Sequence, residues 1–382
     1  MEKTNSKKHI ALFISSLHKG GSERVLVNLA EYFHARSYRV TIVTQYQSDN
    51  EYSFNSGITR ILSDITGDEG GKGRIANFHR RFQKLRGIWK KQKPDLILSF
   101  IGKNNLMAIL TSRGLGIPVV VAVRGEPALE YYSGALRLAA RTVFGLADGV
   151  ILQTAGSMDF FPAKIQKKAV ILKNPLNPAF IREPYTGERE KQIVAVGRLD
   201  ANKNHEMIIR AFAGLPDRYR EYQLIIYGEG ELHQSLRKLS EELGVQERVS
   251  LPGPVSDVAE AIYRASVFVL SSYSEGMPNT LLEAMALGLP VISTDCSGGG
   301  PRELITDGEN GILVKPGDWK NMGENLQKIL DNPNYAWRLG ESASKMQEKF
   351  NPDIINRSWE TCLTGMMEHK KRRNEDDMET GC

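Results

Sequence analysis

Apolar residues along the chain occur in short continuous runs, and helical patterns separate one run from the next. The first run, at 9–15, is followed by Gly20-Gly21 and then by apolar positions at helical spacing from Val25 to Phe33. Further runs occur at 40–44, 95–100, 119–123 and 149–152. Continuous apolar strands that alternate with helices are typical of a parallel sheet covered on both faces. This half of the chain is therefore predicted to form an α/β domain.

The same pattern restarts after a break near the middle of the chain. Asn174-Pro175, Asn177-Pro178 and the polar stretch 182–191 mark the break. Strands are then predicted at 193–197, 224–228, 267–270 and 291–293, with helices at 206–212, 231–243 and 281–287.

These patterns predict two Rossmann-like parallel-sheet domains in tandem. We place the first domain at 1–178 and the second at 179–355. We expect a helix at 356–370 that packs back toward the first domain, and a polar, disordered tail at 371–382.

Composition narrows the class of protein only slightly. Of 382 residues, 41% are hydrophobic and 25% are charged, which is ordinary for a globular chain. Cys296, Cys362 and Cys382 show no paired or metal-binding spacing, which favours a reducing compartment. The charged N-terminus does not resemble a signal peptide, and no apolar run is long enough to cross a membrane. We expect a cytoplasmic protein that is able to touch the inner face of the cell membrane.

The first candidate for chemistry is the segment 274–292 (SEGMPNTLLEAMALGLPVI), which follows a predicted strand. Glu275 lies in a loop, a helix begins near Pro278, and Glu283 lies about one turn inside it. The amides of Asn279 and Thr280 at the start of that helix favour an anion such as a diphosphate. The two carboxylates can accept hydrogen bonds from sugar and ribose hydroxyls. The alternative is a plain helix start whose acidic residue complements the dipole, and the flanking sequence favours the binding site.

The second candidate is the segment 196–205 (VGRLDANKNH), directly after the first strand of the second domain. Arg198 and Lys203 bring two cations to the carboxyl edge of the sheet, where they could neutralise a diphosphate without a metal. The alternative is a pair of solvated surface charges. No D-x-D triplet is present, so a metal site of that carboxylate-clamp type is not expected.

Glycine-rich turns argue against a dinucleotide cofactor. Gly20 and Gly21 would let the backbone approach a ligand closely, but the pattern G-x-G-x-x-G is absent there. Gly228-Glu229-Gly230 comes nearest, with His233 in place of the third glycine. The segment 296–304 (CSGGGPREL) could form the floor of a pocket, with Cys296 as a packing residue and not a nucleophile.

Taken together, these motifs resemble glycosyltransferase family 4, a family of retaining enzymes with the GT-B architecture. They comprise GGSERVLVNLA in the first domain and, in the second, VGRL, Lys203, Glu275-x7-Glu283, GPREL and NGILV at 310–314. The resemblance covers about residues 8–365. It implies two Rossmann-like domains that face each other across a cleft, of which the first binds the acceptor and the second binds the nucleotide-sugar donor. The form SEGMPN…STDC…GPRE resembles enzymes that build bacterial surface polysaccharides and lipid-linked oligosaccharides.

The resemblance implies a role for each candidate residue. Glu275 would contact hydroxyls of the transferred sugar, Glu283 would hold the donor ribose, and Arg198 and Lys203 would bind the diphosphate and stabilise it as it leaves. Glu275, Arg198 and Lys203 are the catalytic candidates. Further donor contacts would come from Gly20, Gly21, Gly276, Met277, Asn279 and Thr280. The donor would be a UDP-linked hexose or N-acetylhexosamine, the acceptor a lipid-linked glycan, and no metal or cofactor is expected.

One residue departs from the family pattern. Many relatives place a histidine after the fourth strand of the first domain, near the sugar, whereas this chain has Arg124 in the segment VAVRGEP. Arg124 is therefore a candidate for contact with the acceptor or the sugar, and a role transferred from that histidine is in doubt.

The segment 72–93 is strongly basic and amphipathic. It contains nine lysines and arginines and no acidic residue, and Ile75, Phe78, Phe82, Leu85 and Trp89 recur at helical spacing. Such a helix can lie on an anionic membrane, or it can pack its apolar stripe on the sheet with solvated charges outside. Both can hold at once. Nucleic acid is not expected, because no recognisable module accompanies the charge.

Two other functions fit parts of this pattern. A nucleotide-sugar epimerase can share the architecture and the diphosphate site, and it would convert the donor without an acceptor. A nucleotide-sugar-binding protein without turnover is the other alternative, although the presence of all four charged residues favours an enzyme.

Overall fold

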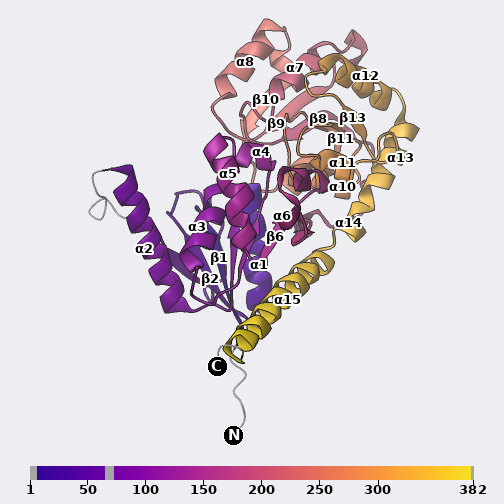
Figure 1. Cartoon of the computed structure of the whole chain (residues 1–382). Helices are drawn as coiled ribbons and strands as arrows, with labels where there is room; N and C mark the ends of the chain where they lie inside the picture. The colour runs from indigo at the N-terminus through magenta and orange to yellow at the C-terminus, as the bar shows by residue number, and fades with distance from the viewer. Residues whose placement is uncertain (1–6, 65–72, 380–382) are drawn as a thin grey trace. The chain divides into compact units, whose positions relative to one another are not determined.

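The computed structural model describes residues 7–64 and 73–379 and divides the chain into two compact units. The first unit combines Met1–Lys173 with Asp353–Cys382, and the second is Asn174–Pro352. The first unit is therefore built from both ends of the chain, whereas the second is one continuous segment (Figure 1).

The first unit contains a seven-stranded sheet in the order β3-β2-β1-β4-β5-β6-β7. Every neighbouring pair is parallel. The strands are β1 (His9–Ile14), β2 (Arg39–Thr44), β3 (Thr59–Leu62), β4 (Leu96–Phe100), β5 (Val119–Ala122), β6 (Gly149–Leu152) and β7 (Ala169–Ile171). Because alternate residues of a strand point to opposite faces, the buried central strands supply two separate cores.

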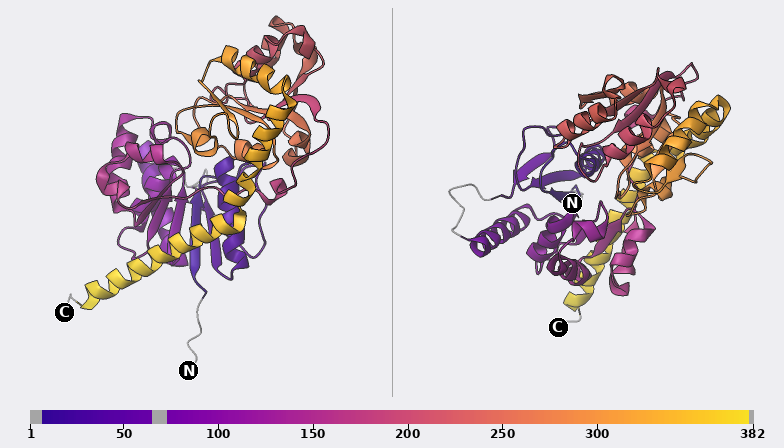
Figure 2. Two further views of the ribbon diagram at one scale, coloured as in Figure 1. Left: turned by 90° about the vertical axis from the view of Figure 1, so that its right-hand side faces the viewer. Right: turned by 90° about the horizontal axis from the view of Figure 1, so that it is seen from above.

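Helices cover both faces of this sheet. They are α1 (Gly21–Ala35), α2 (Arg74–Gln92), α3 (Gly102–Ser112), α4 (Pro127–Glu130), α5 (Gly134–Val143), α6 (Ala163–Gln166) and α15 (Pro352–Glu379). One core joins α1 and α15 to residues such as Ile10 and Leu12 of β1. The other joins α2, α3 and α5 to Ala11 and Phe13 of the same strand. Figure 2 shows α15, in yellow, running across the sheet of this unit.

The second unit contains a six-stranded parallel sheet in the order β10-β9-β8-β11-β12-β13. Its strands are β8 (Glu190–Val196), β9 (Gln223–Tyr227), β10 (Val249–Gly253), β11 (Ala265–Leu270), β12 (Val291–Thr294) and β13 (Ile312–Val314). The prediction of two Rossmann-like parallel-sheet domains is confirmed.

Helices also cover both faces of the second sheet. They are α7 (His205–Ala213), α8 (His233–Glu242), α9 (Val258–Tyr263), α10 (Asn279–Ala286), α11 (Gly300–Leu304), α12 (Trp319–Leu330), α13 (Pro333–Ser344) and α14 (Met346–Lys349). One core is formed with α7, α8 and α12, and the other with α9 and α10.

The boundaries between the units differ from those expected from the sequence. Leu176 and Phe180 are buried in a core of the second unit, so the chain enters that unit at Asn174 and not after residue 178. It returns to the first unit at Asp353 and not after residue 355. The segment around these prolines packs against the second unit, because a loop that contains prolines can still bury its apolar side chains.

The C-terminal segment also differs from the prediction. A disordered tail was expected at 371–382, but α15 continues through Glu379, and residues 380–382 lie outside the described part of the chain. Trp359, Leu363 and Met367 anchor the first half of α15 in the core of the first unit. Extending an established helix through good helix formers such as lysine, arginine and glutamate costs little, because nucleation has already occurred.

No helix within residues 7–64 and 73–379 is long and apolar enough to cross a membrane.

Candidate functional site

The donor-binding residues predicted in the second domain lie in loops at one edge of its sheet. From β8 the chain proceeds to β9 and β10 on one side, and β11 then begins the strands on the other side. The carboxyl ends of β8 and β11 therefore form a topological switch point, which is where open parallel sheets bind ligands. Arg198 and Lys203 lie in the loop after β8, and Glu275 lies in the loop after β11.

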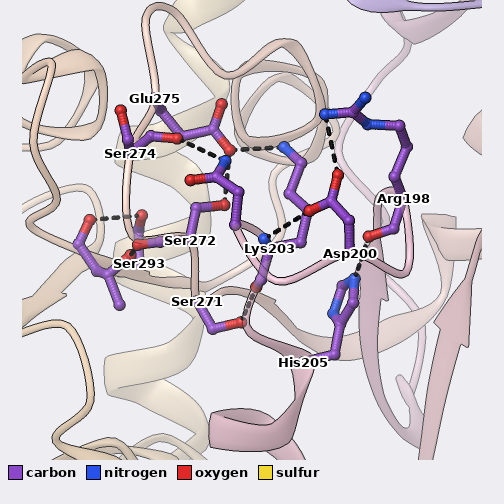
Figure 3. A network of polar contacts seen from close by, with 11 residues as sticks. Arg198, Asp200, Lys203, His205, Ser271, Ser272, Ser274, Glu275 and Ser293 are labelled. Atoms are coloured by element: carbon purple, nitrogen blue, oxygen red, sulfur yellow. Dashed lines mark hydrogen bonds and ion pairs between the residues drawn. The ribbon is translucent and has the colours of Figure 1, made fainter. Parts of the chain in front are cut away.

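An ion pair joins these two loops. Lys203 Nζ lies 2.5 Å from Glu275 Oε1, and the Ser272 hydroxyl donates to the same oxygen at 2.6 Å. The side chains of Lys203 and Glu275 are 17% and 12% exposed, so both charges are largely withdrawn from water. A cation and a carboxylate from neighbouring strands thus meet at the switch point (Figure 3).

Asp200 organises the two cations. Its carboxylate pairs with Arg198 Nη2 at 2.9 Å and accepts the backbone N–H of Lys203 at 3.0 Å. The Arg198 side chain is 74% exposed, in contrast to that of Lys203. An exposed guanidinium can turn toward an incoming phosphate at small cost, because water already solvates it in the unbound protein.

His205 supports the loop from below (Figure 3). Its Nε2 lies 3.1 Å from the carbonyl oxygen of Arg198, and the ring is buried. Burial, with the charge of Lys203 as a second cause, lowers the pKa of His205 from 6.5 to about 4. The imidazole is therefore neutral at neutral pH and serves as a fixed hydrogen-bonding group.

Further hydrogen bonds tie the loop after β8 to the loop after β11. The Asn202 side chain donates to the Ser274 carbonyl at 3.0 Å, and the Tyr273 N–H donates to the Asn202 carbonyl at 2.8 Å. The Ser271 hydroxyl donates to the Lys203 carbonyl at 2.7 Å. Lys203 and Glu275 are thus held by their own backbones as well as by their side chains.

Helix α10 begins beside this ion pair, with Pro278 as its N-cap residue and Asn279 as its first residue. The Asn174 side chain donates to Asn279 Oδ1 at 2.7 Å, and the Asn174 N–H donates to the Met277 sulfur at 3.3 Å. These contacts fix the start of the helix, whose amides and dipole favour a negative charge.

Glu283 lies in the fifth position of α10 and is only 2% exposed. Little of this carboxylate is therefore open to a ligand in this structure. Its contact with a donor ribose stays a prediction.

Two glycines are required where loops at this edge touch through their backbones. A Cβ atom on Gly300 would lie 1.5 Å from the carbonyl oxygen of Gly276. A Cβ on Gly228 would lie 1.9 Å from the carbonyl oxygen of Gly197, and Gly228 also has a φ of +142°. The loops after β8 and β11 can be this close to their neighbours only because side chains are absent there.

Cys296 packs beneath the site. Its side chain is 2% exposed, and burial together with the nearby Glu275 charge raises the pKa of its thiol to about 12. The thiol therefore stays protonated at neutral pH. This agrees with a packing role, whereas a nucleophilic cysteine would have to be a thiolate.

The remaining predicted residues belong to the first unit. Gly20 is the N-cap of α1 and Gly21 is its first residue, at the end of the loop that follows β1. Arg124 follows β5 and is 6% exposed, with its guanidinium over the rings of Phe100 and Trp359 at 5.0 and 5.6 Å. Burial lowers the pKa of Arg124 to about 9. The packing role was not foreseen, and a contact of Arg124 with sugar or acceptor stays a prediction.

Sequence reasoning missed several residues that shape the site. Asp200 stands inside the quoted segment VGRLD, and a carboxylate two positions from Arg198 was a usable signal. Ser272 gave no signal, because a serine at a strand end is common. Asn174 gave none either, because its partner Asn279 lies 105 residues further along the chain.

No group of three or more histidine, cysteine, aspartate or glutamate side chains that could hold a metal ion occurs among the described residues.

Two family models match the chain. The model described as glycosyl transferases group 1 matches residues 178–346, and the glycosyl transferase 4-like domain matches residues 20–171. An uncharacterized glycosyltransferase of Methanocaldococcus jannaschii is 30% identical over 339 residues, which is 75% of this chain and 83% of that protein. The chain belongs to the glycosyltransferases.

Relatives with more specific names act in bacterial glycan assembly. One from Campylobacter jejuni is 27% identical over 92% of this chain and 96% of its own length. It is a GalNAc-alpha-(1->4)-GalNAc-alpha-(1->3)-diNAcBac-PP-undecaprenol alpha-1,4-N-acetyl-D-galactosaminyltransferase. The amylovoran biosynthesis glycosyltransferase AmsD of Erwinia amylovora is 22% identical over 90% of this chain and 96% of its own length. This glycosyltransferase is thus related to bacterial enzymes of polysaccharide and lipid-linked glycan synthesis.

Solved structures agree with the fold of this glycosyltransferase. Anabaena HepE in complex with UDP has a TM-score of 0.77 at 17% identity, covering 94% of this chain and all (100%) of HepE. Sucrose-phosphate synthase from Thermosynechococcus elongatus has a TM-score of 0.82 at 19% identity, covering 95% of this chain and 100% of that enzyme. The predicted GT-B fold is therefore confirmed.

Proposed function

We propose that this chain is a retaining glycosyltransferase that moves a hexose or an N-acetylhexosamine from a UDP-sugar to a lipid-linked glycan in bacterial cell-surface polysaccharide synthesis. The observation that carries the proposal is the contact between Lys203 and Glu275 at the switch point of the second sheet. The retaining outcome is supported by the resemblance that Glu275-x7-Glu283 carries, and UDP by its presence in the related structure of HepE.

In this proposal the donor replaces protein contacts that already exist. The diphosphate pairs with Lys203 in place of Glu275 and with Arg198 in place of Asp200. The start of α10 adds further positive potential. The freed Glu275 carboxylate accepts hydrogen bonds from sugar hydroxyls. As the glycosidic bond breaks, negative charge grows on the leaving UDP, and the two cations stabilise it without a metal ion.

The proposed acceptor is lipid-linked, which places the reaction at the cytoplasmic face of a membrane. The undecaprenyl diphosphate in the name of the Campylobacter relative supports this acceptor. Helix α2 supports contact with an anionic membrane, because its stripe is only partly buried. Leu85 and Trp89 lie in the core, whereas Ile75 and Phe78 are 86% and 54% exposed. Of the predicted basic segment 72–93, Lys72 lies outside the described residues.

The donor site is tested by calorimetric titration of UDP, GDP and NAD into the purified protein. We expect UDP to bind, and Lys203→Ala to weaken binding at least about tenfold through loss of a charge-assisted phosphate contact. Lys191→Ala is the matched control, because Lys191 is an exposed, ion-paired lysine near the opposite end of β8. A preference for GDP would indicate a GDP-sugar donor, and binding of NAD alone would contradict the proposal.

Product analysis separates transfer from the alternatives. The protein is incubated with UDP-sugars, with and without lipid-linked acceptors, and the Glu275→Ala variant runs in parallel. We expect glycosylated acceptor only when both substrates are present, and its loss in the variant. Conversion of the donor sugar without an acceptor would identify an epimerase, and binding without any product would identify a non-catalytic protein.

A further inference from the structure

The first unit contains a cavity of about 500 Å³ at the carboxyl edge of its own sheet. Its lining includes Ser15 after β1, Gln45 after β2 and Ile101 after β4. In the strand order of this sheet, β1 and β4 are neighbours that begin runs toward opposite edges. The cavity therefore lies at a switch point, the usual ligand position in a parallel sheet. Its volume lies within the range of about 300–1,000 Å³ that is typical of small-molecule sites.

Apolar side chains form most of the cavity wall. Eight of the fifteen lining residues are apolar, and six of these come from three helices, namely Phe78 and Leu85 of α2, Leu106, Met107 and Leu110 of α3, and Leu136 of α5. The other seven lining residues are polar or charged. The apolar part of the wall suits a hydrocarbon chain, whose transfer onto it removes apolar area from water.

The apolar character continues from the cavity to the surface of α2. Phe78 lines the cavity and is 54% exposed, and Ile75 lies one turn before it on α2. An apolar surface that leads from water into an apolar cavity suits a ligand whose chain enters from a membrane.

The same three helices carry only positive charge. Helices α2, α3 and α5 together contain ten lysines and arginines and no aspartate or glutamate. Lys103 and Arg81 line the cavity itself. Asp64 is the one acidic lining residue, and it is held by Arg81 Nε at 3.2 Å. The surroundings of the cavity therefore favour a ligand that combines a hydrocarbon chain with an anionic group.

We propose that this cavity binds the first part of the isoprenoid chain of a polyisoprenyl diphosphate carrier, with Lys103 and Arg81 facing the diphosphate. The choice of an isoprenoid diphosphate rests on the proposed function, because a lipid-linked acceptor brings a chain and a diphosphate together. The other observations do not depend on the proposed function. They are the apolar part of the cavity wall, the exposed apolar residues of α2 and the positive charge of the three helices, all within the first unit.

Binding of water-soluble short-chain probes tests the proposal on the full-length protein. Farnesyl diphosphate, isopentenyl diphosphate and inorganic diphosphate are titrated in a calorimeter. We expect farnesyl diphosphate to bind at least about tenfold more tightly than the other two, because only its chain is long enough to fill the cavity. Equal affinity for all three probes in the wild-type protein would overturn the proposal.

A matched pair of substitutions on α5 locates the chain. Leu136→Trp fills the cavity and should remove the preference for farnesyl diphosphate, whereas Leu138→Trp changes the same helix outside the cavity and should keep it. Met107→Trp repeats the test from α3 if Leu136→Trp fails to fold. An equal loss in Leu136→Trp and Leu138→Trp would place the chain elsewhere and overturn the proposal.

A second pair tests the diphosphate contact. Lys103→Glu should weaken farnesyl diphosphate binding about tenfold or more, and Lys90→Glu on the exposed end of α2, which does not line the cavity, should have a smaller effect. UDP titrations on the same samples keep the two proposals apart. Normal UDP binding without any binding of farnesyl diphosphate would reject the cavity proposal alone, and the reverse result would reject the donor site alone.

Discussion

Lys203 and Glu275 stabilise each other before any donor arrives, because both side chains are mostly buried. Removing one partner leaves the other charge in a poorly solvated place. We expect Lys203→Ala and Glu275→Ala each to destabilise the second unit by about 1–3 kcal/mol. The double variant should be less destabilised than the sum of the two, because it leaves no buried charge without its partner.

Denaturant unfolding of the four proteins of this double-mutant cycle measures the coupling. The activity of both single variants should be low, which alone cannot tell a structural role from a direct one. Strictly additive destabilisation would show that the ion pair is not formed in solution.

His205 makes stability depend on pH. Its pKa is about 4 in the folded protein and 6.5 in the unfolded chain. Between pH 6.5 and 4, His205 is protonated in the unfolded chain but stays neutral in the folded protein. The stability of the second unit should therefore be greatest above pH 6.5 and fall by roughly 2–3 kcal/mol as the pH approaches 4.

Hydrogen exchange of peptides from β8, measured between pH 7.5 and 4.5 with correction for the intrinsic rate, reports this change, because the unfolded value of 6.5 lies inside that range. His205→Gln retains a hydrogen-bond donor to the Arg198 carbonyl but does not titrate, so its stability should vary less with pH. His9→Gln is the control, because burial also lowers the pKa of His9 to about 4, but in the first unit. An unchanged pH dependence in His205→Gln would contradict the assignment.

Gly300, the first residue of α11, lets this helix start pack closely against the loop after β11. Its backbone lies against the Gly276 carbonyl, where a methyl group does not fit. We expect Gly300→Ala to destabilise the second unit by about 2 kcal/mol or more, and to weaken UDP binding by moving the loop that carries Glu275. Gly214→Ala is the control in the same unit, because its Cβ would have ordinary contacts. Thermal melting and UDP titration check both variants, and wild-type behaviour of Gly300→Ala would refute the close contact.

The strands that the sequence pattern missed share one property. The nine strands predicted from apolar runs are all internal to the two sheets, whereas β3, β7, β10 and β13 are the four edge strands. Internal strands are buried on both faces and read as continuous apolar runs. Edge strands are short and partly solvated, as in β3, of which no residue is buried. Their sequences therefore resemble loops, and only the neighbouring strand shows that they pair.

The same contrast holds for the candidate site. Glu275, Lys203 and Arg198 could be selected because each follows a strand end within a recognisable motif. The contact of Asn174 with Asn279 depends on which segments become neighbours, which the local pattern does not contain. Arg124 is the clearest case, because its place over the rings of Phe100 and Trp359 is created by two segments far apart in the sequence.

The chain divides into one continuous unit and one discontinuous unit. Both cores of the second unit are formed within Asn174–Pro352. We expect the fragment 174–352, produced alone, to fold and to bind UDP within about tenfold of the affinity of the full chain. The fragment 1–173 lacks Trp359 and Leu363 and should not fold cooperatively. Thermal melting and UDP titration test both fragments, and an unfolded 174–352 would contradict the division.

The discontinuous first unit has a consequence for synthesis on the ribosome. Its sheet is translated before the second unit, yet α15, which packs on one face, is translated after it. At about 5–20 residues per second, the roughly 200 intervening residues take about 10–40 s to make. Throughout that time the face of the first sheet that packs against α15 stays partly exposed, while the second unit can already fold. Nascent chains of this protein should therefore engage chaperones through their oldest segment, and a premature stop near the C-terminus should yield an aggregating product instead of a slightly shorter enzyme.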